Sequence, residues 1–309
     1  MLFRSVAELF AGPGDQVVVP DLYWDNYSLV FEESCGAKLV TFNTFRKGAF
    51  DVAAMKAALL APGDKKLLIL NFPNNPTGYT ATLDDAKKIV SAVKSAASKG
   101  KKIVVILDDA YFGLVYEPGI HGESLFAEFS DLHRNVLAVK LDGTTKEDYV
   151  WGMRVGFITF AWKGATDAQL KAIAAKAAGN VRSCISNVTS IGQHMALAAY
   201  KDPGYARQKR AKHAVLQKRY LVIRRLLKSH PEWQALFDPM PFNSGYFMCV
   251  KPKGVDAEAV RRRLIEKYST GTIVLSGLIR LAFSTTPSAK LPKLFQNVAD
   301  AVADLVAAK

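Results

Sequence analysis

The chain has 309 residues, of which 50% are hydrophobic, so it can bury a large core and is long enough for one large and one smaller domain. Its formal charge is +13 at pH 7, but Lys and Arg are spread through helical segments without a basic tail; we therefore expect solvated surface charge and no nucleic-acid partner. No segment reaches a membrane-spanning length, and we expect no membrane partner.

The cysteines and histidines predict no metal site. Cys35, Cys184 and Cys249 are odd in number, widely separated and set in apolar surroundings, which is typical of reduced core thiols. The five histidines show no spacing suited to metal ligands. We therefore expect a cytoplasmic protein without a structural metal.

The predicted elements begin with an amphipathic helix that starts almost at Met1 and has Leu2, Val6, Leu9 and Phe10 on one face. Apolar runs typical of strands follow at residues 16–20, 37–42, 67–70, 103–107, 136–141 and 155–160. Helical patterns lie between them at residues 27–35, 83–98 and 125–129. Because buried strands alternate with helices, the sequence predicts an α/β fold with a mostly parallel sheet sandwiched by helices.

The remaining elements predict a smaller C-terminal α+β domain. Helices are expected over residues 166–178, 203–229, 257–268 and 290–308, with a turn and strand over 242–250 and a strand over 279–283. We divide the chain into a cofactor-binding large domain, residues 1–205, and a small domain, residues 206–309. The long helix at 203–229 is interpreted as a bridge between them.

Polar residues follow three successive predicted strands. They occupy Asn71–Gly78, Asp108–Tyr111 and Asp142–Lys146. In a parallel α/β sheet the carboxyl ends of the strands share one edge, and ligands bind there. The sequence therefore predicts a functional crevice at this edge.

The stretch from Gly143 to Gly156 carries two residues with distinctive chemistry. Lys146 lies among small hydroxyl residues and Arg154 follows eight positions later. A lysine can form a Schiff base, most readily when burial beside a fixed cation lowers its pKa from about 10.4. An arginine can hold an anion as a bidentate fork.

Taken with Asn75, Asp108 and Tyr111, this pair suits pyridoxal 5'-phosphate. That cofactor needs a lysine for its aldehyde, a carboxylate for its ring nitrogen, donors for its phenolic oxygen and cations or backbone amides for its phosphate. Lys140 is the nearest competitor of Lys146, but strand alternation places it within the sheet. Asp109 is the alternative to Asp108 as the buried acid.

Four short motifs occur in a recognisable order: Asn75-Pro76-Thr77-Gly78, Asp108-x-Ala110-Tyr111, Thr145-Lys146 with Arg154-Val155-Gly156, and Ile279-Arg280-Leu281. On these motifs the chain resembles the fold type I pyridoxal-phosphate enzymes of the class I/II aminotransferase family, in its aspartate and aromatic aminotransferase branch. The resemblance covers essentially the whole chain.

The resemblance implies a role for each matching residue. Lys146 would form the Schiff base and shuttle a proton, Asp108 would keep the pyridine nitrogen protonated, and Asn75 and Tyr111 would bind the phenolic oxygen. For the rest of the cofactor, Arg154 and Thr145 would bind the phosphate, and Trp24 or its rival Tyr23 would stack on the ring. For the substrate, Arg280 would bind the α-carboxylate, and Arg182 would bind a dicarboxylate side chain in the partner subunit's site.

The implied function is transamination between an amino acid (aspartate, glutamate or an aromatic one) and a 2-oxo acid, by a homodimer. Two alternatives stay open, a carbon–sulfur β-lyase of the same fold and a non-catalytic remnant. Family members usually have a serine where this chain has Gly143, so one phosphate contact is absent or is supplied by Thr144 and Thr145. They also carry an N-terminal arm and a glycine-rich phosphate-binding turn, which we expect this chain to lack.

Overall fold

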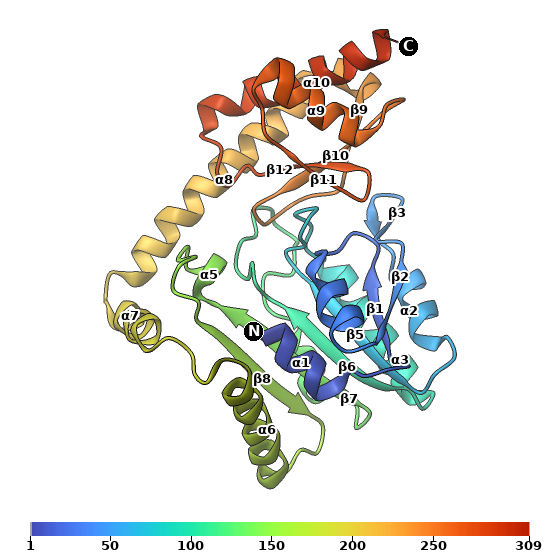
Figure 1. Cartoon of the computed structure of the whole chain (residues 1–309), viewed down its shortest axis with the longest axis vertical. Coiled ribbons are helices and arrows are strands. Elements are labelled where there is room, and N and C mark those ends of the chain that lie inside the picture. Colours follow the sequence, from blue (N-terminus) through green and yellow to red (C-terminus); the bar gives the residue numbers. More distant parts are fainter. Residues whose placement is uncertain (1, 309) are drawn as a thin grey trace. The chain divides into compact units, whose positions relative to one another are not determined.

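The computed structural model describes residues 2–308, which divide into two compact units (Figure 1). The first unit runs to Pro73 and adds Ala81–Gly113 and Gly119–Tyr205. The second runs from Ala206 and adds Asn74–Thr80 and Leu114–Pro118. These two short segments were assigned to the large domain from sequence, whereas here they pack with the C-terminal part of the chain.

Within residues 2–308, the first unit is built on a six-stranded sheet with the order β2-β1-β5-β6-β7-β8. Its strands are β1 (Gln16–Pro20), β2 (Lys38–Phe42), β5 (Lys65–Asn71), β6 (Lys102–Asp108), β7 (Val136–Gly143) and β8 (Gly156–Trp162). The pairings from β2 through β7 are parallel, and β8 runs antiparallel to β7. The expected mostly parallel sheet is thereby confirmed.

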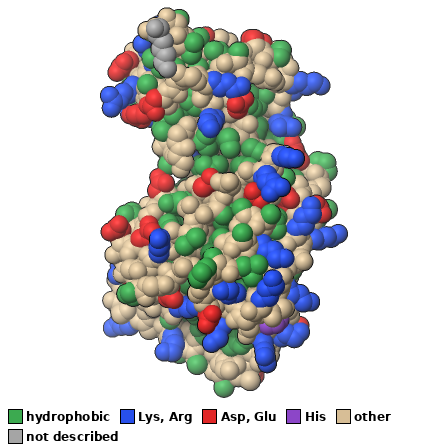
Figure 2. All heavy atoms as spheres, turned by 90° about the vertical axis from the view of Figure 1, so that its right-hand side faces the viewer, with side chains coloured by type: hydrophobic (Ala, Val, Ile, Leu, Met, Phe, Trp, Pro, Cys, Tyr) green, Lys and Arg blue, Asp and Glu red, His purple; other side chains and the backbone are tan. Residues whose placement is uncertain are grey.

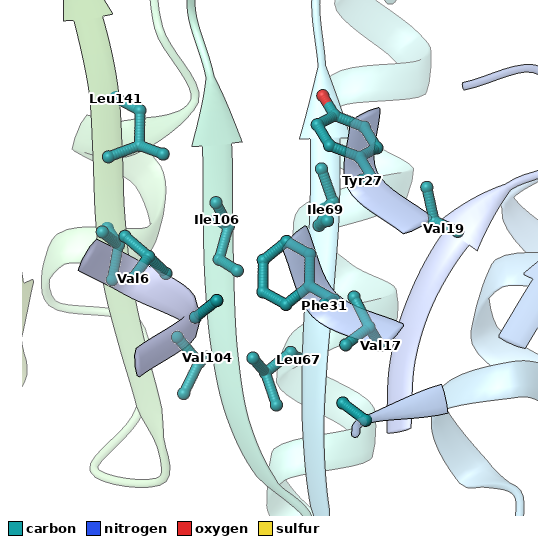
Figure 3. Packing of buried hydrophobic residues seen from close by; sticks show 13 residues of the cluster. Val6, Val17, Val19, Tyr27, Phe31, Leu67, Ile69, Val104, Ile106 and Leu141 are labelled. Carbon is teal, nitrogen blue, oxygen red and sulfur yellow. The ribbon is translucent and has the colours of Figure 1, made fainter. Parts of the chain in front are cut away.

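One face of this sheet is covered by α1 (Leu2–Phe10) and the π-helical turn η1 (Ser28–Glu33). Figure 3 shows Val6 and Phe31 from these elements packed against inward-facing strand residues such as Leu67 and Ile106. The alternate strand positions are also buried and face the opposite side, which α2 (Val52–Leu60) and α3 (Leu83–Ser98) cover. Burial on both faces explains why the strands read as continuous apolar runs.

Helix ends in the first unit follow local chemistry where the sequence supplies it. Thr82 and Asp85 form a capping box at the start of α3, and Thr166 and Gln169 form another at the start of α6 (Asp167–Ile185). The predicted range of α3 is therefore confirmed. α6 continues past the expected end at residue 178, through Gly179 and Asn180, to Ile185, although glycine and asparagine usually mark a helix end.

Several elements of the first unit have no clear signal in the sequence. They are α2 and α7 (Ser190–Lys201), together with the two-residue strands β3 (Phe45–Arg46) and β4 (Ala49–Phe50). In α2 apolar residues occur on all sides, and in α7 most side chains are exposed, so neither shows the amphipathic period of a helix packed on a core.

All three cysteines are free thiols, as expected, but they are not equally buried. Cys249 is buried and Cys35 is partly exposed while packing against the core, whereas the expectation of a core position was wrong for the partly exposed Cys184. Cys184 lies on α6, where Ala177 is the buried residue of the helix, and its sulfur is 3.6 Å from a carboxylate oxygen of Glu8. The helix contacts the rest of the unit along too narrow a strip to bury that thiol.

The second unit contains, within the described residues, a four-stranded antiparallel sheet with the order β11-β12-β10-β9. The strands are β9 (Phe237–Pro239), β10 (Met248–Pro252), β11 (Ile273–Leu275) and β12 (Leu278–Leu281). The helices are α8 (Tyr205–Ser229), α9 (Ala257–Tyr268) and α10 (Leu291–Ala307), with 3-10 turns at Pro231–Ala235 and Ser288–Lys290. This agrees with the expected smaller α+β part.

The surface shows dispersed charge. Figure 2 shows Lys and Arg side chains spread over the visible face, with Asp and Glu side chains among them. Over residues 2–308, no helix combines the length and the apolar character that crossing a membrane requires.

A tight contact holds the short segment Asn74–Thr80 in the second unit. Gly78 has a φ of +74°, its carbonyl accepts bonds from the backbone N–H and the hydroxyl of Ser244, both at 2.9 Å, and Asn243 Nδ2 donates to Thr80 O at 2.9 Å. A Cβ at position 78 would lie 2.9 Å from the Ser244 carbonyl oxygen and closer still to that of Phe247. Glycine is therefore required here for both its conformation and its size.

We predict that Gly78→Ala destabilises the protein far more than Gly48→Ala. Both glycines have positive φ, +74° and +80°, but a Cβ at Gly48 would meet nothing within 4 Å. The left-handed conformation costs about 1–2 kcal/mol for alanine at either site, and overpacking adds about 1–3 kcal/mol at position 78 alone. Equilibrium urea unfolding measures the difference, and equal losses for the two variants would contradict it.

Candidate functional site

The carboxyl ends of β5, β6 and β7 bring polar residues to one edge of the first unit's sheet. Asn71 ends β5 beside Asp108, which ends β6, and its amide donates to the Asp108 carbonyl at 2.9 Å. Asp108 is in turn in register with Leu141 of β7, just before the Asp142–Lys146 segment. The predicted meeting of these three strand ends is therefore present.

Asp108 is a buried carboxylate with a specific partner. Its side chain accepts from the Tyr27 hydroxyl at 2.5 Å and from the Ala110 N–H at 3.2 Å, and the residue is 4% exposed. Burial raises the pKa of Asp108 to about 6, and the bond from Tyr27 opposes that rise. Burial and the adjacent carboxylate also raise the pKa of Tyr27 well above its usual value, so Tyr27 remains the donor.

Asp109 belongs to a second buried network. It accepts from the Ser124 hydroxyl at 2.5 Å and lies 3.9 Å from the Lys140 amine, which also bonds Asp142. Burial raises the pKa of Asp109 to about 7, against the opposing effects of Ser124 and Lys140. Lys140, the competitor of Lys146, is thus held within the sheet by carboxylates.

Lys146 lies on the single helical turn α5 (Thr144–Glu147), which follows β7 directly. Its amine is 5.9 Å from the centroid of the buried Tyr111 ring. The turn is fixed at its start because the Thr144 N–H donates to the Val155 carbonyl at 3.2 Å. An amine, an aromatic ring and a buried acid therefore extend from neighbouring strand ends.

Gly143 is required by the close approach of β7 and β8. It is in register with Gly156, and a Cβ at Gly143 would lie 2.5 Å from the Val155 oxygen and 2.8 Å from the Gly156 Cα. The serine expected from the resemblance would not fit this pair without movement of a strand. In this sheet, position 143 therefore requires glycine.

Trp24 belongs to an aromatic cluster rather than standing alone. Its ring contacts the Tyr27 ring edge-on at 5.7 Å, and Tyr23 is stacked with Tyr27 at 6.2 Å between centroids. Phe3 of α1 packs on both Trp24 and Tyr27, at 6.0 and 5.1 Å. Trp24 is 36% exposed, so part of its ring is open for contact.

The other candidates of the first unit lie toward solvent. Thr145 is partly exposed, and Arg154 is exposed with a φ of +55°, two residues before β8 begins at Gly156. Arg182 lies on α6, is exposed, and donates to the Ser186 hydroxyl at 2.5 Å.

In the second unit, Asn75 and Arg280 are joined directly. The Arg280 Nη1 donates to Asn75 Oδ1 at 2.7 Å, and the guanidinium lies over the Phe247 ring at 4.3 Å. The Cys249 thiol, in register with Arg280, donates to the Pro76 carbonyl at 3.3 Å. Stacking and the amide bond fix the plane of a guanidinium that can bind a carboxylate as a fork.

Sequence reasoning missed Tyr27 and Phe247. Tyr27 stood in the Tyr23–Tyr27 aromatic run, but no period relates it to Asp108, which lies 81 residues away. Phe247 follows Tyr246 in an apolar run that reads as core. Only tertiary structure pairs these rings with their charged partners.

A family model described as aminotransferase class I and II matches residues 3–298. The chain belongs to the class I and II aminotransferase family. Members of this family depend on pyridoxal phosphate.

Two curated relatives illustrate the range of similarity. The aspartate aminotransferase of Thermotoga maritima is 26% identical over 293 residues, which cover 92% of this chain and 68% of the relative. The probable N-acetyl-LL-diaminopimelate aminotransferase of Bacillus subtilis is 29% identical over 156 residues, covering 50% of this chain and 35% of the relative. Matches thus span from about a third to two thirds of these curated aminotransferases.

Solved structures in the same family share the fold. An aminotransferase from Anaerococcus prevotii superposes with a TM-score of 0.85 at 26% identity, covering 96% of this chain and 72% of that one. The aspartate aminotransferase of Thermotoga maritima gives a TM-score of 0.75 at 20% identity.

In residues 2–308 no cluster of three or more His, Cys, Asp or Glu is placed to hold a metal ion.

We predict that Asp108→Asn removes a contribution that makes the free energy of unfolding fall as pH rises. The pKa of Asp108 is raised on folding, so the native state binds more protons than the unfolded state between about pH 4 and pH 6, and this carboxyl lowers stability as pH rises through that window. A shift of about two units corresponds to about 3 kcal/mol. Urea unfolding at pH 4 and pH 8 tests this.

The expected result concerns the free energy of unfolding of the variant minus that of the wild type. This difference should be about 2–3 kcal/mol more favourable to the variant at pH 8 than at pH 4. Asp108 is also one of the charges that raise the pKa of Asp109, so the variant reduces the pH-dependent contribution of Asp109 in the same direction. A stability difference that stays constant across this range would contradict the burial-raised pKa of Asp108.

Proposed function

We propose that this chain catalyses pyridoxal-phosphate-dependent transamination between an amino acid and a 2-oxo acid. The observation that carries the proposal is the buried Asp108–Tyr27 pair at the strand ends, with the Lys146 amine beside Tyr111 on the next strand end. The family supports the cofactor, and the first unit supplies the acid, the amine and the aromatic surface that the cofactor requires.

The residues of the first unit fit the cofactor's chemistry. Asp108, kept from water and hydrogen-bonded by Tyr27, would hold the proton of the pyridine nitrogen. Asp109 suits that role less well, because Ser124 and Lys140 already engage its carboxylate. Tyr111 would donate to the phenolic oxygen, and the part-exposed Trp24 would cover the ring face, in preference to Tyr23.

When bound, the cofactor draws electrons away from the α-carbon of the amino acid. Lys146 would first hold the cofactor and then, as a free amine, take the proton from that α-carbon at its Nζ. Its place on a one-turn helix anchored to Val155 limits the directions that the amine can reach. Such orientation is worth several kcal/mol of the barrier.

Anionic groups would be held by arginines and hydroxyls. We assign the phosphate to Arg154 and Thr145, and the substrate α-carboxylate to Arg280, whose plane is set by Phe247 and Asn75. Asn75 accepts from Arg280 through its oxygen, while its amide group has donors suited to the phenolic oxygen. Arg182 would bind a dicarboxylate side chain in the site of a partner subunit.

The amino donor is proposed to be aspartate, glutamate or an aromatic amino acid, handled by a cytoplasmic homodimer. The names of the relatives support transamination over the β-lyase alternative, since they are aspartate and other aminotransferases. The non-catalytic alternative differs from both enzymes because such a protein would not bind the cofactor.

We predict that added pyridoxal phosphate forms a link that borohydride traps on Lys146. The wild type should develop a visible absorption band, and peptide mass spectrometry should place the reduced cofactor on Lys146. Lys146→Ala should lose the band entirely, whereas Lys163→Ala, which removes an exposed lysine of the same unit paired with Asp131 at 3.7 Å, should keep it. If the wild type folds cooperatively but never forms the band, the result would support the alternative that the chain is a non-catalytic remnant.

The reaction type is decided by the need for an acceptor. We predict that loss of amino acid requires an added 2-oxo acid and yields one new amino acid per acceptor consumed, measured by chromatography. Release of ammonia and pyruvate from cysteine conjugates without an added oxo acid would instead establish the β-lyase.

A further inference from the structure

Asp148 closes the turn that carries Lys146 and is engaged from outside by two tyrosines. The Tyr200 hydroxyl donates to its Oδ2 at 2.8 Å, and the Tyr205 hydroxyl donates to its Oδ1 at 2.5 Å. Both carboxylate oxygens are thus bonded to residues more than fifty positions away in sequence. Hydrogen bonds to an ionised acceptor are roughly twice as strong as neutral ones.

The two tyrosines both belong to the first unit but come from different helices. Tyr200 lies in the last turn of α7, and Tyr205 is the first residue of α8. Their rings pack edge-to-face with centroids 5.3 Å apart, so each holds the other in place. Burial and the neighbouring carboxylate raise the pKa of Tyr200, which keeps its hydroxyl a donor.

The turn on which they act has little stability of its own. α5 has four residues, and its N-cap, Gly143, provides no side-chain bond. At its end the Asp148 N–H donates to the Thr144 carbonyl at 3.1 Å and the Tyr149 N–H donates to the Lys146 carbonyl at 3.3 Å. Tyr149 then takes a φ of +61°, which does not continue a helix.

We propose that Asp148, Tyr200 and Tyr205 form a positioning clasp that holds the α5 turn closed and so sets the direction of the Lys146 amine. Thr144 anchors the start of the turn on Val155, and the clasp anchors its end. Lys146 lies between these two anchors. None of the three clasp residues reacts; they act through the backbone of the turn.

The clasp rests on the proposed function for its effect on Lys146, but its effect on the turn can be measured without cofactor. The test compares the wild type with Tyr200→Phe, Tyr205→Phe and the double variant, which remove hydroxyls and keep the rings. Tyr268→Phe is the matched control, because its hydroxyl also donates to an aspartate, Asp304, at 2.8 Å, but in the second unit.

The first readout is amide hydrogen exchange at Asp148 and Tyr149 in the protein without cofactor. Loss of each hydroxyl should speed exchange about two- to tenfold, since solvent exposure of Tyr200 and partial exposure of Tyr205 limit each bond to about 0.5–1.5 kcal/mol and each 1.4 kcal/mol is a factor of ten. Tyr268→Phe should leave both amides at the wild-type rate. Asp148→Asn, which keeps an acceptor but loses the charge, should give an intermediate acceleration.

The second readout is the rate constant for trapping pyridoxal phosphate on Lys146 at saturating cofactor. It should fall about tenfold in the double variant, because the amine is less often correctly directed, while thermal stability falls no further than in Tyr268→Phe.

Unchanged exchange at Asp148 and Tyr149 in the double variant would overturn the clasp. Faster exchange with an unchanged trapping rate would overturn its role in positioning Lys146. If the wild type never links cofactor to Lys146, the proposed function fails, while the exchange comparison still decides whether the clasp orders the turn.

Discussion

The hydrogen bond from Tyr27 to Asp108 is the interaction on which the candidate site depends. A carboxyl at the end of a buried parallel strand is disfavoured as an ion, and its raised pKa shows this cost. The tyrosine partly offsets the cost and belongs to the same aromatic cluster as Trp24. One residue thus links the acid to the ring-stacking candidate and ties both to the sheet core.

The sheet explains why the remaining groups of the first unit gather beside this acid. Parallel strands that are apolar along their length leave their polar residues at the ends, and adjacent ends share an edge. Asn71, Asp108 and the segment leading to Lys146 follow neighbouring strands. The Gly143–Gly156 pair lets β8 approach β7 closely enough for Val155 to anchor the turn of Lys146.

Much of the fold could be predicted because its signals are local. Apolar runs located the strands of the large sheet, and the capping box of Thr82 located the start of α3. α2 and α7 lacked such signals, one being apolar all round and the other largely exposed. For the site, motif order named Asp108, Lys146 and Arg280. Their supporting residues, which are Tyr27, Phe247 and the two tyrosines bonded to Asp148, are defined only by contacts distant in sequence.

Arg280 and Lys146, in two separate units, are each restricted by neighbouring residues, but by different physical means. Each is a flexible cationic side chain that loses much conformational entropy on being directed at a ligand. Phe247 and Asn75 restrict the guanidinium through its own plane, whereas the Asp148 clasp restricts the lysine through the backbone beneath it. The difference suits their chemistry: a carboxylate fork needs a fixed plane, whereas a lysine that holds a cofactor and then moves a proton needs a mobile end on a fixed base.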